Sequence, residues 1–187
     1  MSVTLGIAGL EMQIGDHVCA FYRGVERDEL LIPFLEAGMR TGDKCICVVD
    51  SDRPETLIAS LERELAADCV ERHQLAVLSS ESAYLVGGEF VPTRMVQFWD
   101  DNVRSVGEMT WALRDARGVD QLVSYESELN RFLPRYPQVI LCLYDVERFG
   151  GDIILDMLKT HPKVLLNGMV LDNPYYLEPD EFLARLG

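Results

Sequence analysis

The 187-residue chain lacks a surplus of basic residues: 31 acidic side chains outnumber 17 Lys and Arg, and the formal net charge is −14. A field of this sign repels nucleic-acid phosphates and anionic lipid head groups, so direct binding to either is disfavoured. The chain also lacks an apolar run of the roughly 20 residues that cross a bilayer, and its start has no signal-peptide pattern. We therefore expect a cytoplasmic protein that contacts neither nucleic acid nor membrane.

Cysteines are few and odd in number, which argues against a disulfide framework. Four of the five lie in apolar runs typical of strands, where reduced, buried thiols are common in cytosolic proteins. Cys45 and Cys47 share one face of a predicted strand. No further Cys or His stands beside them at metal-ligand spacing, so the sequence predicts core thiols, no metal site and no cofactor. A redox role for this pair is left open.

The chain does contain short apolar runs that alternate with segments of helical periodicity, a pattern that predicts βαβ units. We expect a single α/β domain over residues 1–187, with its core at about 13–178: a three-layer fold with a mainly parallel β-sheet flanked by helices. Strands are predicted at residues 17–22, 44–50, 75–79, 104–109, 139–145 and 164–171. Helices are predicted at residues 27–40, 51–67, 92–101, 151–160 and 179–185, with a helical stretch after residue 109 that breaks at Gly118 and ends near Leu133.

In an open parallel sheet, ligands bind beyond the carboxyl ends of the strands. The first loop at that edge, residues 22–29, lies where a P-loop enzyme carries G-x-x-x-x-G-K-[ST]. This loop has one glycine, no lysine and three carboxylates, which would repel a polyphosphate. The sequence therefore predicts no Walker A loop, no ordinary ATP hydrolysis and no catalytic residues.

Carboxylates and aromatic side chains are the first candidate site residues. Asp145 ends the clearest predicted strand, in the place of a Walker B aspartate, and either contacts magnesium or a ligand or caps the next helix. An acidic and aromatic group suited to an amine, a cation or a polar organic ligand is formed by Glu108, Trp111, Tyr125, Glu126 and Glu128. The alternative is an amphipathic helix that packs Tyr125 into the core and leaves its glutamates in water.

Two histidines and a cysteine have both a functional and a structural interpretation. His17 begins the first strand and orients a carboxylate, binds a ligand or is a satisfied core histidine. His161 ends a helix, where the macrodipole would stabilise its charged form without a ligand. Cys19 shares the face of His17 on a strand that we expect to be buried, and no G-x-S-x-G elbow is present for nucleophilic catalysis.

The chain resembles a known family in a series of ordered blocks. The blocks are GDHVCAFY at 15–22, FLEAG at 34–38, GDKC at 42–45, RSVGEMTWAL at 104–113, YESELN at 125–130, LCLYD at 141–145, HP at 161–162 and NPYY at 173–176. They are similar to those of the MEDS domains, sensory domains named after methanogens, methylotrophs and a dichloromethane-responsive regulator. The resemblance covers nearly the whole chain.

This resemblance implies a RecA/KaiC-like fold that has lost its phosphate loop, in agreement with the acidic loop. It also implies a sensory input for transcription regulators, histidine kinases or sigma-factor systems, with a small organic ligand such as a hydrocarbon derivative and without a cofactor. We expect no attached DNA-binding or kinase segment, so the signal would pass by contact with a regulatory protein of the histidine-kinase or sigma-factor type, or through a homo-oligomer.

Three hypotheses follow for the function. The first is a non-catalytic, ligand-binding sensory domain with its pocket at the carboxyl edge and residues 23–28 as its mobile element. Its candidate ligand-binding residues are Tyr22, Glu108, Trp111, Tyr125, Glu126, Tyr144 and Asp145, with His17, Cys19 and His161 as second choices. The second is a divergent nucleotide-binding, ATPase-like protein that uses Glu108, Asp145 and magnesium, with Lys44 and Arg114 reaching the phosphates. The third is a ligand-free interaction module for a kinase or sigma-factor system.

Overall fold

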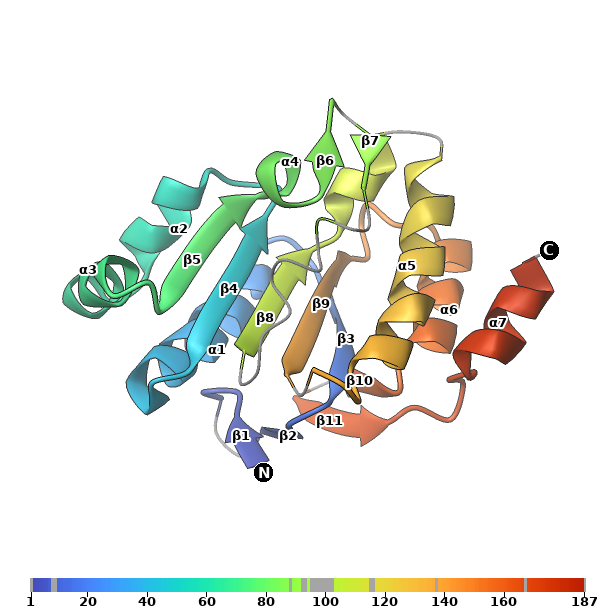
Figure 1. Cartoon of the computed structure of the whole chain (residues 1–187), viewed down its shortest axis with the longest axis horizontal. Helices are drawn as coiled ribbons and strands as arrows, with labels where there is room; N and C mark the ends of the chain where they lie inside the picture. The colour runs from blue at the N-terminus through green and yellow to red at the C-terminus, as the bar shows by residue number, and fades with distance from the viewer. Residues whose placement is uncertain are drawn as a thin grey trace.

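A seven-stranded sheet forms the centre of the computed structural model, which describes residues 2–7, 10–87, 89–91, 94, 103–114, 117–136, 138–166 and 168–186. The order of its strands is β11-β10-β3-β9-β8-β4-β5, and every neighbouring pair is parallel except β10 with β11. The predicted α/β class and mainly parallel sheet are therefore confirmed (Figure 1). The strands are β3 (His17–Tyr22), β4 (Lys44–Val49), β5 (Leu75–Ser79), β8 (Val103–Glu108), β9 (Val139–Asp145), β10 (Lys163–Leu166) and β11 (Met169–Asp172).

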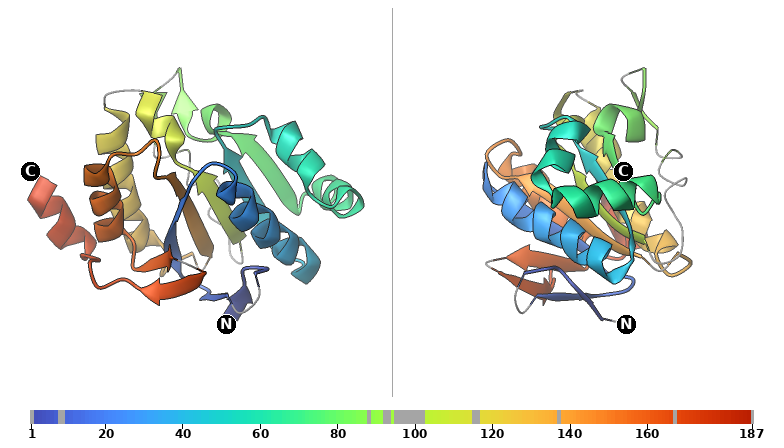
Figure 2. Two further views of the ribbon diagram at one scale, coloured as in Figure 1. Left: turned by 180° about the vertical axis from the view of Figure 1, so that it is seen from behind. Right: turned by 90° about the vertical axis from the view of Figure 1, so that its left-hand side faces the viewer.

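Helices cover both faces of this sheet. The helical elements are α1 (Glu26–Thr41), α2 (Pro54–Ser60), α3 (Arg63–Glu71), α4 (Ser80–Ala83), η2 (Thr110–Arg114, a 3-10 helix), α5 (Gly118–Phe132), α6 (Gly151–Thr160) and α7 (Pro179–Leu186). In Figure 1, α5 lies in front of the sheet and α1 behind it, and the rear view in Figure 2 brings α1 to the front. The helices α1, α2 and α3 share one hydrophobic core with the sheet, whereas α5, α6 and α7 share a second one on its other face.

The helix α1 shows how local sequence sets an element and its packing. It is capped at its carboxyl end by Gly42, whose φ of 83° is left-handed and whose N–H bonds to the carbonyls of Gly38 and Met39. Near the same end, a Cβ atom on Gly38 would lie 2.6 Å from Cys45 Sγ and 2.7 Å from Arg104 Nε. The carboxyl end of α1 therefore packs so closely against the side chains of β4 and β8 that only glycine fits at position 38.

Two predicted elements differ from the observed ones. The predicted helix at 51–67 is two helices, since the backbone turns extended at Leu61, where ψ is 165°. The predicted strand at 164–171 is instead the antiparallel hairpin of β10 and β11, because Gly168 takes a φ of 70° between them. The predicted helix at 92–101 lies almost wholly outside the described residues. Short strands at β1 (Ser2–Thr4), β2 (Glu11–Gln13), β6 (Leu85–Val86) and β7 (Glu89–Phe90) were not predicted.

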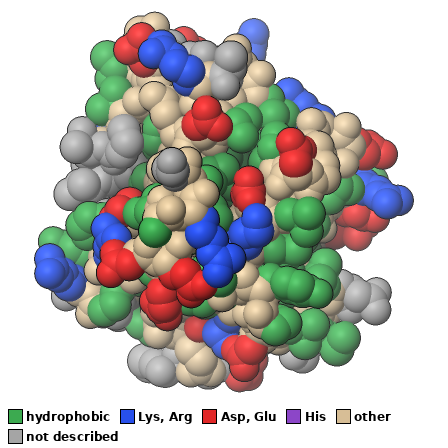
Figure 3. Space-filling model, turned by 90° about the vertical axis from the view of Figure 1, so that its right-hand side faces the viewer, with side chains coloured by type: hydrophobic (Ala, Val, Ile, Leu, Met, Phe, Trp, Pro, Cys, Tyr) green, Lys and Arg blue, Asp and Glu red, His purple; other side chains and the backbone are tan. Residues whose placement is uncertain are grey.

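The outer face beside α7 shows how the acidic surface is balanced locally. Figure 3 views this side, where acidic and basic side chains lie next to one another among hydrophobic ones. Arg131 on α5 pairs with Asp180 of α7, and Arg185 pairs with Glu181 at 2.5 Å.

None of the helices in the described ranges has the length and apolar character that a bilayer crossing requires.

Candidate functional site

Side-chain alternation along the strands sends the predicted site residues to opposite faces of the sheet. Tyr22 on β3 belongs to the core beneath α1, and Asp145, paired with it on β9, lines a hollow on that side. Cys142 and Tyr144 belong to the core beneath α5 and α6, and His17 reaches a side chain of α5 there. The candidates therefore form separate groups, not the single carboxyl-edge pocket that the sequence predicted.

Glu108 is the centre of the group at the carboxyl edge and is fully buried. Its Oε2 accepts hydrogen bonds from the main-chain N–H of Asp50 at 2.7 Å and of Ser51 at 3.2 Å. Its Oε1 accepts from the Ser51 hydroxyl at 2.7 Å, from Arg27 Nη1 at 3.3 Å and from the Tyr22 hydroxyl at 3.4 Å. The buried carboxylate is thus surrounded by donors, which offset the cost of removing its charge from water.

Arg27, like Ser51, belongs to this group but was not predicted from the sequence as a site residue. Its guanidinium is mostly buried and also bonds Asp28 through Nε at 2.8 Å and Asp52 through Nη2 at 2.5 Å. Burial alone would lower the pKa of Arg27, but Asp52, Glu108 and Asp28 outweigh that effect and raise it. Burial and then the charge of Glu108 raise the pKa of the Tyr22 hydroxyl. At neutral pH the group therefore holds a cation and a neutral phenol.

An open hollow of ≈ 440 Å³ lies above this group at the carboxyl edge of the sheet. Its wall is made by Tyr22, Gly24, Val25, Arg27, Asp28, Ser51, Asp52, Asp145 and Arg148. The acidic loop after β3 is therefore one wall of the hollow, in the place where a phosphate loop would lie. Asp145 contributes to this wall, and its Oδ1 also accepts the N–H of Glu147 at 2.9 Å in a turn. It does not cap α6, whose N-cap is Gly150.

Two basic residues that the nucleotide hypothesis invokes are placed differently by the structure. Lys44 begins β4 and so lies at the amino end of the strand, away from the carboxyl edge. Its predicted contact with phosphates at that edge is wrong. Arg114 does lie at the carboxyl edge, where its guanidinium pairs with Asp50.

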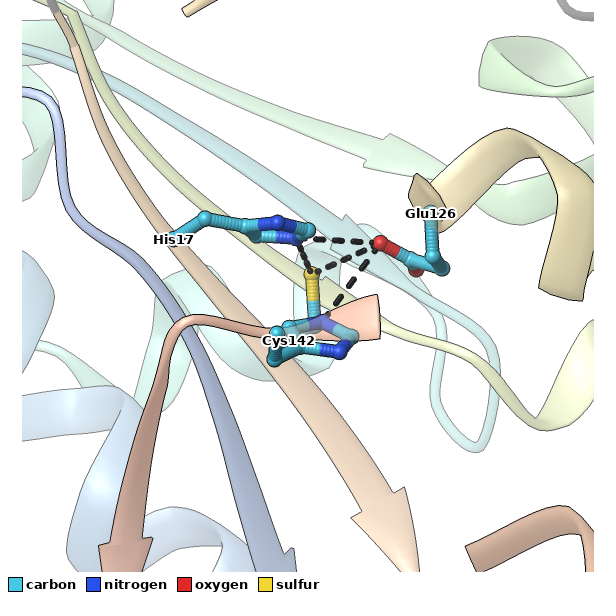
Figure 4. A group of neighbouring side chains, drawn as sticks. His17, Glu126 and Cys142 are labelled. Carbon is cyan, nitrogen blue, oxygen red and sulfur yellow. Dashed lines mark hydrogen bonds and ion pairs between the residues drawn. The ribbon is translucent and has the colours of Figure 1, made fainter. Parts of the chain in front are cut away.

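A second, fully buried group surrounds Glu126 on the opposite face of the sheet. We call it the Glu126 cluster: Glu126 from α5, His17 from β3, Cys142 and Tyr144 from β9, and His161 between α6 and β10. Figure 4 shows the side chains of His17, Cys142 and Glu126 converging. Glu126 Oε2 lies 3.0 Å from His17 Nε2, 3.6 Å from Cys142 Sγ and 3.5 Å from His161 Nε2, and Cys142 Sγ lies 3.5 Å from His17 Nε2. The alternative that leaves the α5 glutamates in water is wrong for Glu126.

The burial of this cluster determines its protonation. Burial, and then the neighbouring His17, lower the pKa of His161 to about 3, so its imidazole is neutral at neutral pH. The prediction of a charged His161 stabilised by the helix macrodipole is therefore wrong. Burial and then Glu126 raise the pKa of the Cys142 thiol and of Tyr144, whose hydroxyl donates to Glu126 Oε1 at 2.9 Å. Burial would raise the pKa of Glu126, but His17, His161 and Tyr144 together lower it, so Glu126 is ionised.

Two residues here were not predicted from the sequence as site residues. Cys142 is a member of the Glu126 cluster, and Asn130 is its neighbour. Asn130 follows Glu126 by four residues and so lies on the same face of α5. Its Oδ1 lies 3.1 Å from His17 Nδ1, and its Nδ2 donates to the Thr160 carbonyl at 2.7 Å. Cys142 precedes Tyr144 by two residues on one strand, so period-two counting from Tyr144 was the available signal for it.

Trp111 and Tyr125 belong to a third group, which is aromatic. Phe90 stacks on Trp111 with ring centroids 4.7 Å apart and meets Tyr125 edge-on at 5.4 Å, while Tyr84 lies 5.2 Å from Trp111. Tyr125 therefore packs into the core, as the structural alternative predicted. Cys19 is buried on the face of His17, as predicted, and its Sγ donates to the Lys163 carbonyl at 3.6 Å. The ligand-binding roles of these three residues stay predictions.

Comparison with known proteins shows the family to which this chain belongs. Residues 16–162 match the sequence model of the family described as "MEthanogen/methylotroph, DcmR Sensory domain", or MEDS. The chain belongs to the MEDS family. The transcriptional repressor DcmR of Methylorubrum extorquens is 32% identical over 164 residues, which are 83% of this chain and 61% of the repressor. The MEDS chain thus spans 61% of the length of this curated relative, and the family and the relative together support a sensory role in regulation.

Solved structures show the same fold. The flagellar accessory protein FlaH of Methanocaldococcus jannaschii superimposes with a TM-score of 0.58 at 10% identity, over 85% of the MEDS chain and 76% of FlaH. A KaiC-like protein of Pyrococcus horikoshii superimposes with a TM-score of 0.61 at 16% identity, over 88% of this chain and 79% of its own. The predicted RecA/KaiC-like architecture is therefore confirmed, and at these identities the similarity concerns the fold alone.

Proposed function

We propose that this MEDS domain is a non-catalytic cytoplasmic sensor that binds a small, polar organic ligand in the hollow beside Glu108. The observation that carries the proposal is the hollow itself, whose ≈ 440 Å³ lie at the carboxyl edge of the sheet. Open α/β sheets bind ligands at this edge, and a volume of about 300–1,000 Å³ suits small molecules. The role in regulation of the family and of the repressor relative agrees with a sensor rather than a metabolic enzyme.

The charges in the wall of the hollow favour a polar ligand over a polyphosphate. Arg27 and Arg148 face three carboxylates, those of Asp28, Asp52 and Asp145. Arg27 already bonds Asp28, Asp52 and Glu108, so its charge is balanced before any ligand arrives. A hydroxyl or carbonyl group can exchange hydrogen bonds with such a wall, whereas a triphosphate would meet uncompensated negative charge.

The same wall offers a route for the signal. Residues 23–28 lead from β3 into α1 and supply Arg27 and Asp28 to the hollow. A ligand shifts a conformational equilibrium only if it contacts the two conformers differently, and this loop is the segment in which such contacts would differ. The proposed recipient is a regulatory protein of the histidine-kinase or sigma-factor type, or a second copy of the chain.

Native mass spectrometry of the freshly purified chain, followed by denaturation to release bound compounds, tests the proposal first. A thermal-shift screen of small alcohols, carboxylic acids, amines and halogenated hydrocarbons then provides probes. We expect at least one compound to raise the melting temperature of the wild type and of the control Arg185→Ala, which changes an exposed arginine of α7. The shift should disappear in Arg148→Ala and Asp145→Asn, since both side chains line the hollow.

Other outcomes separate the rival functions. A shift with ATP and magnesium alone would favour the nucleotide hypothesis. No bound compound and no shift with any probe, together with partner binding that survives Arg148→Ala, Asp145→Asn, Trp111→Ala and Tyr125→Ala in folded protein, would favour a ligand-free interaction module.

A further inference from the structure

The Glu126 cluster contains more acceptors than donors. The Nδ2 group of Asn130 donates to the carbonyls of Thr160, at 2.7 Å, and Glu126, at 3.2 Å, so its Oδ1 must accept from His17 Nδ1. His17 Nε2 then carries a lone pair unless the ring holds a second proton. His161 Nδ1 lies 2.7 Å from the carbonyl of Met157 and therefore carries its proton there, which leaves a second lone pair on Nε2. Both Nε2 atoms face the Glu126 carboxylate, and the single proton of the Cys142 thiol can reach only one of these acceptors, so the arrangement calls for a further proton or a cation.

A proton on His17 would satisfy only part of this requirement. It would bridge His17 Nε2 and Glu126 Oε2 across their 3.0 Å. His161 Nε2 would still lie buried without a hydrogen bond, as it does within the described part of the chain, 3.5 Å from the same oxygen. An unpartnered nitrogen of this kind is costly in a core. One cation bound by all four groups removes the conflict.

The distances suit a tetrahedral metal ion. Zinc bonds of about 2.0–2.3 Å to nitrogen, oxygen and sulfur place tetrahedral ligand atoms about 3.3–3.6 Å apart. Cys142 Sγ lies 3.5 Å from His17 Nε2 and 3.6 Å from Glu126 Oε2, and His161 Nε2 lies 3.5 Å from that oxygen. His17 Nε2 and Glu126 Oε2 lie closer together, at 3.0 Å, and all four candidate ligand atoms lie within 4.8 Å of one another, so small side-chain movements would complete the tetrahedron.

We propose that His17, Glu126, Cys142 and His161 form a binding site for one divalent transition-metal ion, with zinc as the best match to the ligand set. Two imidazoles, a thiolate and a carboxylate are ligands that zinc accepts, whereas magnesium and calcium prefer oxygen alone. The neighbouring contacts fit the same role, since Asn130 and the Met157 carbonyl orient the two rings and Tyr144 holds the second carboxylate oxygen. The proposal departs from the expectation from the sequence that the chain has no metal site.

Binding of the ion replaces one proton of the cluster with a bond to the metal. The Cys142 thiol loses its proton to solvent as the bond from Sγ to the metal forms, while both histidines bind as neutral rings and Glu126 as its carboxylate. Because all four residues are fully buried, the ion enters during folding or on local opening. Four protein ligands leave no open position, so the ion ties β3, β9 and α5 to the segment before β10. The site is independent of the proposed hollow on the other face.

Metal analysis of the full chain, purified under reducing conditions without chelator, is the direct test. We expect one zinc ion per chain. After removal of the metal with chelator in urea, refolding with Zn²⁺ should raise the melting temperature relative to refolding without it. Asn130→Ala should weaken zinc binding by about 10–100-fold, because such outer contacts orient the ligands.

Cobalt identifies the ligands. Refolding with Co²⁺ should give the visible bands of a tetrahedral ion and the near-ultraviolet absorption of a thiolate ligand. The thiolate absorption should be lost in Cys142→Ser and kept in Cys47→Ser, which changes an equally buried thiol in the core beneath α1. Glu126→Gln should weaken zinc binding as well.

Three results would overturn the proposal. Two of them are measured on the wild type, so the test does not depend on the folding of any variant. The three are no bound metal with no stabilisation by Zn²⁺ during refolding, a cobalt spectrum without a thiolate band, and a thiolate band that survives Cys142→Ser. The first would leave a hydrogen-bonded core cluster without a metal ion.

Discussion

Glu108 and Glu126 are two fully buried glutamates on opposite faces of one sheet, and their surroundings differ in kind. Glu108 receives hydrogen bonds from two main-chain amides, two hydroxyls and the Arg27 guanidinium. Glu126 receives hydrogen bonds from the Tyr144 hydroxyl and the Cys142 thiol and otherwise faces two imidazole nitrogens. A buried carboxylate can thus be stabilised by donors built into the fold, or it can require a cation, and here one chain contains both cases.

The largest effect should come from removing the better satisfied carboxylate. Glu108→Ala leaves the Asp50 amide without its partner and removes one of the three acids around Arg27, so we expect a loss of about 3–5 kcal/mol in the free energy of unfolding. Urea unfolding measures it. Glu128→Ala, on the partly exposed outer face of α5, is the control and should cost less than about 1 kcal/mol. Equal losses in the two variants would contradict the central role of Glu108.

The amide substitutions sharpen the contrast. In Glu108→Gln the new NH₂ group meets donors, and we expect a loss of about 1–3 kcal/mol. In Glu126→Gln the NH₂ group meets the lone pairs of His17 and His161, so in chelator-treated protein the loss should stay below about 1 kcal/mol. Parallel urea curves compare the two, and a loss for Glu126→Gln that equals or exceeds the loss for Glu108→Gln would contradict this contrast.

Acid should weaken the metal-free protein through the Glu126 cluster. The pKa of His161 is about 3 in the folded chain against 6.5 as its ordinary value, so below pH 6.5 protons bind the unfolded state preferentially. Stability should therefore fall as the pH drops, by up to about 1.4 kcal/mol per unit, or roughly 2 kcal/mol by pH 5. The lowered pKa of Glu126 adds to this loss only below its unfolded value, near pH 4.5. The groups that face His161 are His17, Glu126, Tyr144 and Cys142, and His161→Gln should flatten the pH profile between 6.5 and 5.

The smallest effect is expected at an ion pair outside both groups. Lys163 and Asp172 join β10 to β11 at 2.8 Å, and Asp172 is almost fully exposed. Water and salt screen such a pair, so Asp172→Ala should leave the melting temperature unchanged. A clear decrease in the melting temperature would contradict this prediction and show that the exposed pair contributes to stability.

The sequence predicted the sheet well because its strands are continuous apolar runs. The strand at 139–145 and the helix at 151–160 were predicted with their observed bounds. Period-two counting also contained more information than was used: Tyr144 and Asp145 are adjacent, so they had to face opposite sides and cannot share one pocket. The residues predicted to line one pocket therefore belong to separate groups on the two faces of the sheet.

The composition of the Glu126 cluster could not be predicted in this way. His17 and Glu126 are 109 positions apart, and their contact depends on which helix covers β3. Their meeting with Cys142 and His161 follows from the packing of α5 and from the pairing of β3 with β9 and β10. Arg27 was missed for a related reason, since a charged residue in the first turn of a helix is usually solvated, and only the fold places it against Glu108.

The close approach at Gly38 has a mechanical consequence for α1. One end of the helix is wedged against Cys45 and Arg104 with no room even for a methyl group, while the other end carries Arg27 into the hollow. A rearrangement that keeps this packing would rotate the amino end of α1 about the fixed contact at Gly38. A small displacement of Arg27 would then rotate the whole of α1. A protein bound to the outer surface of α1 would detect this rotation.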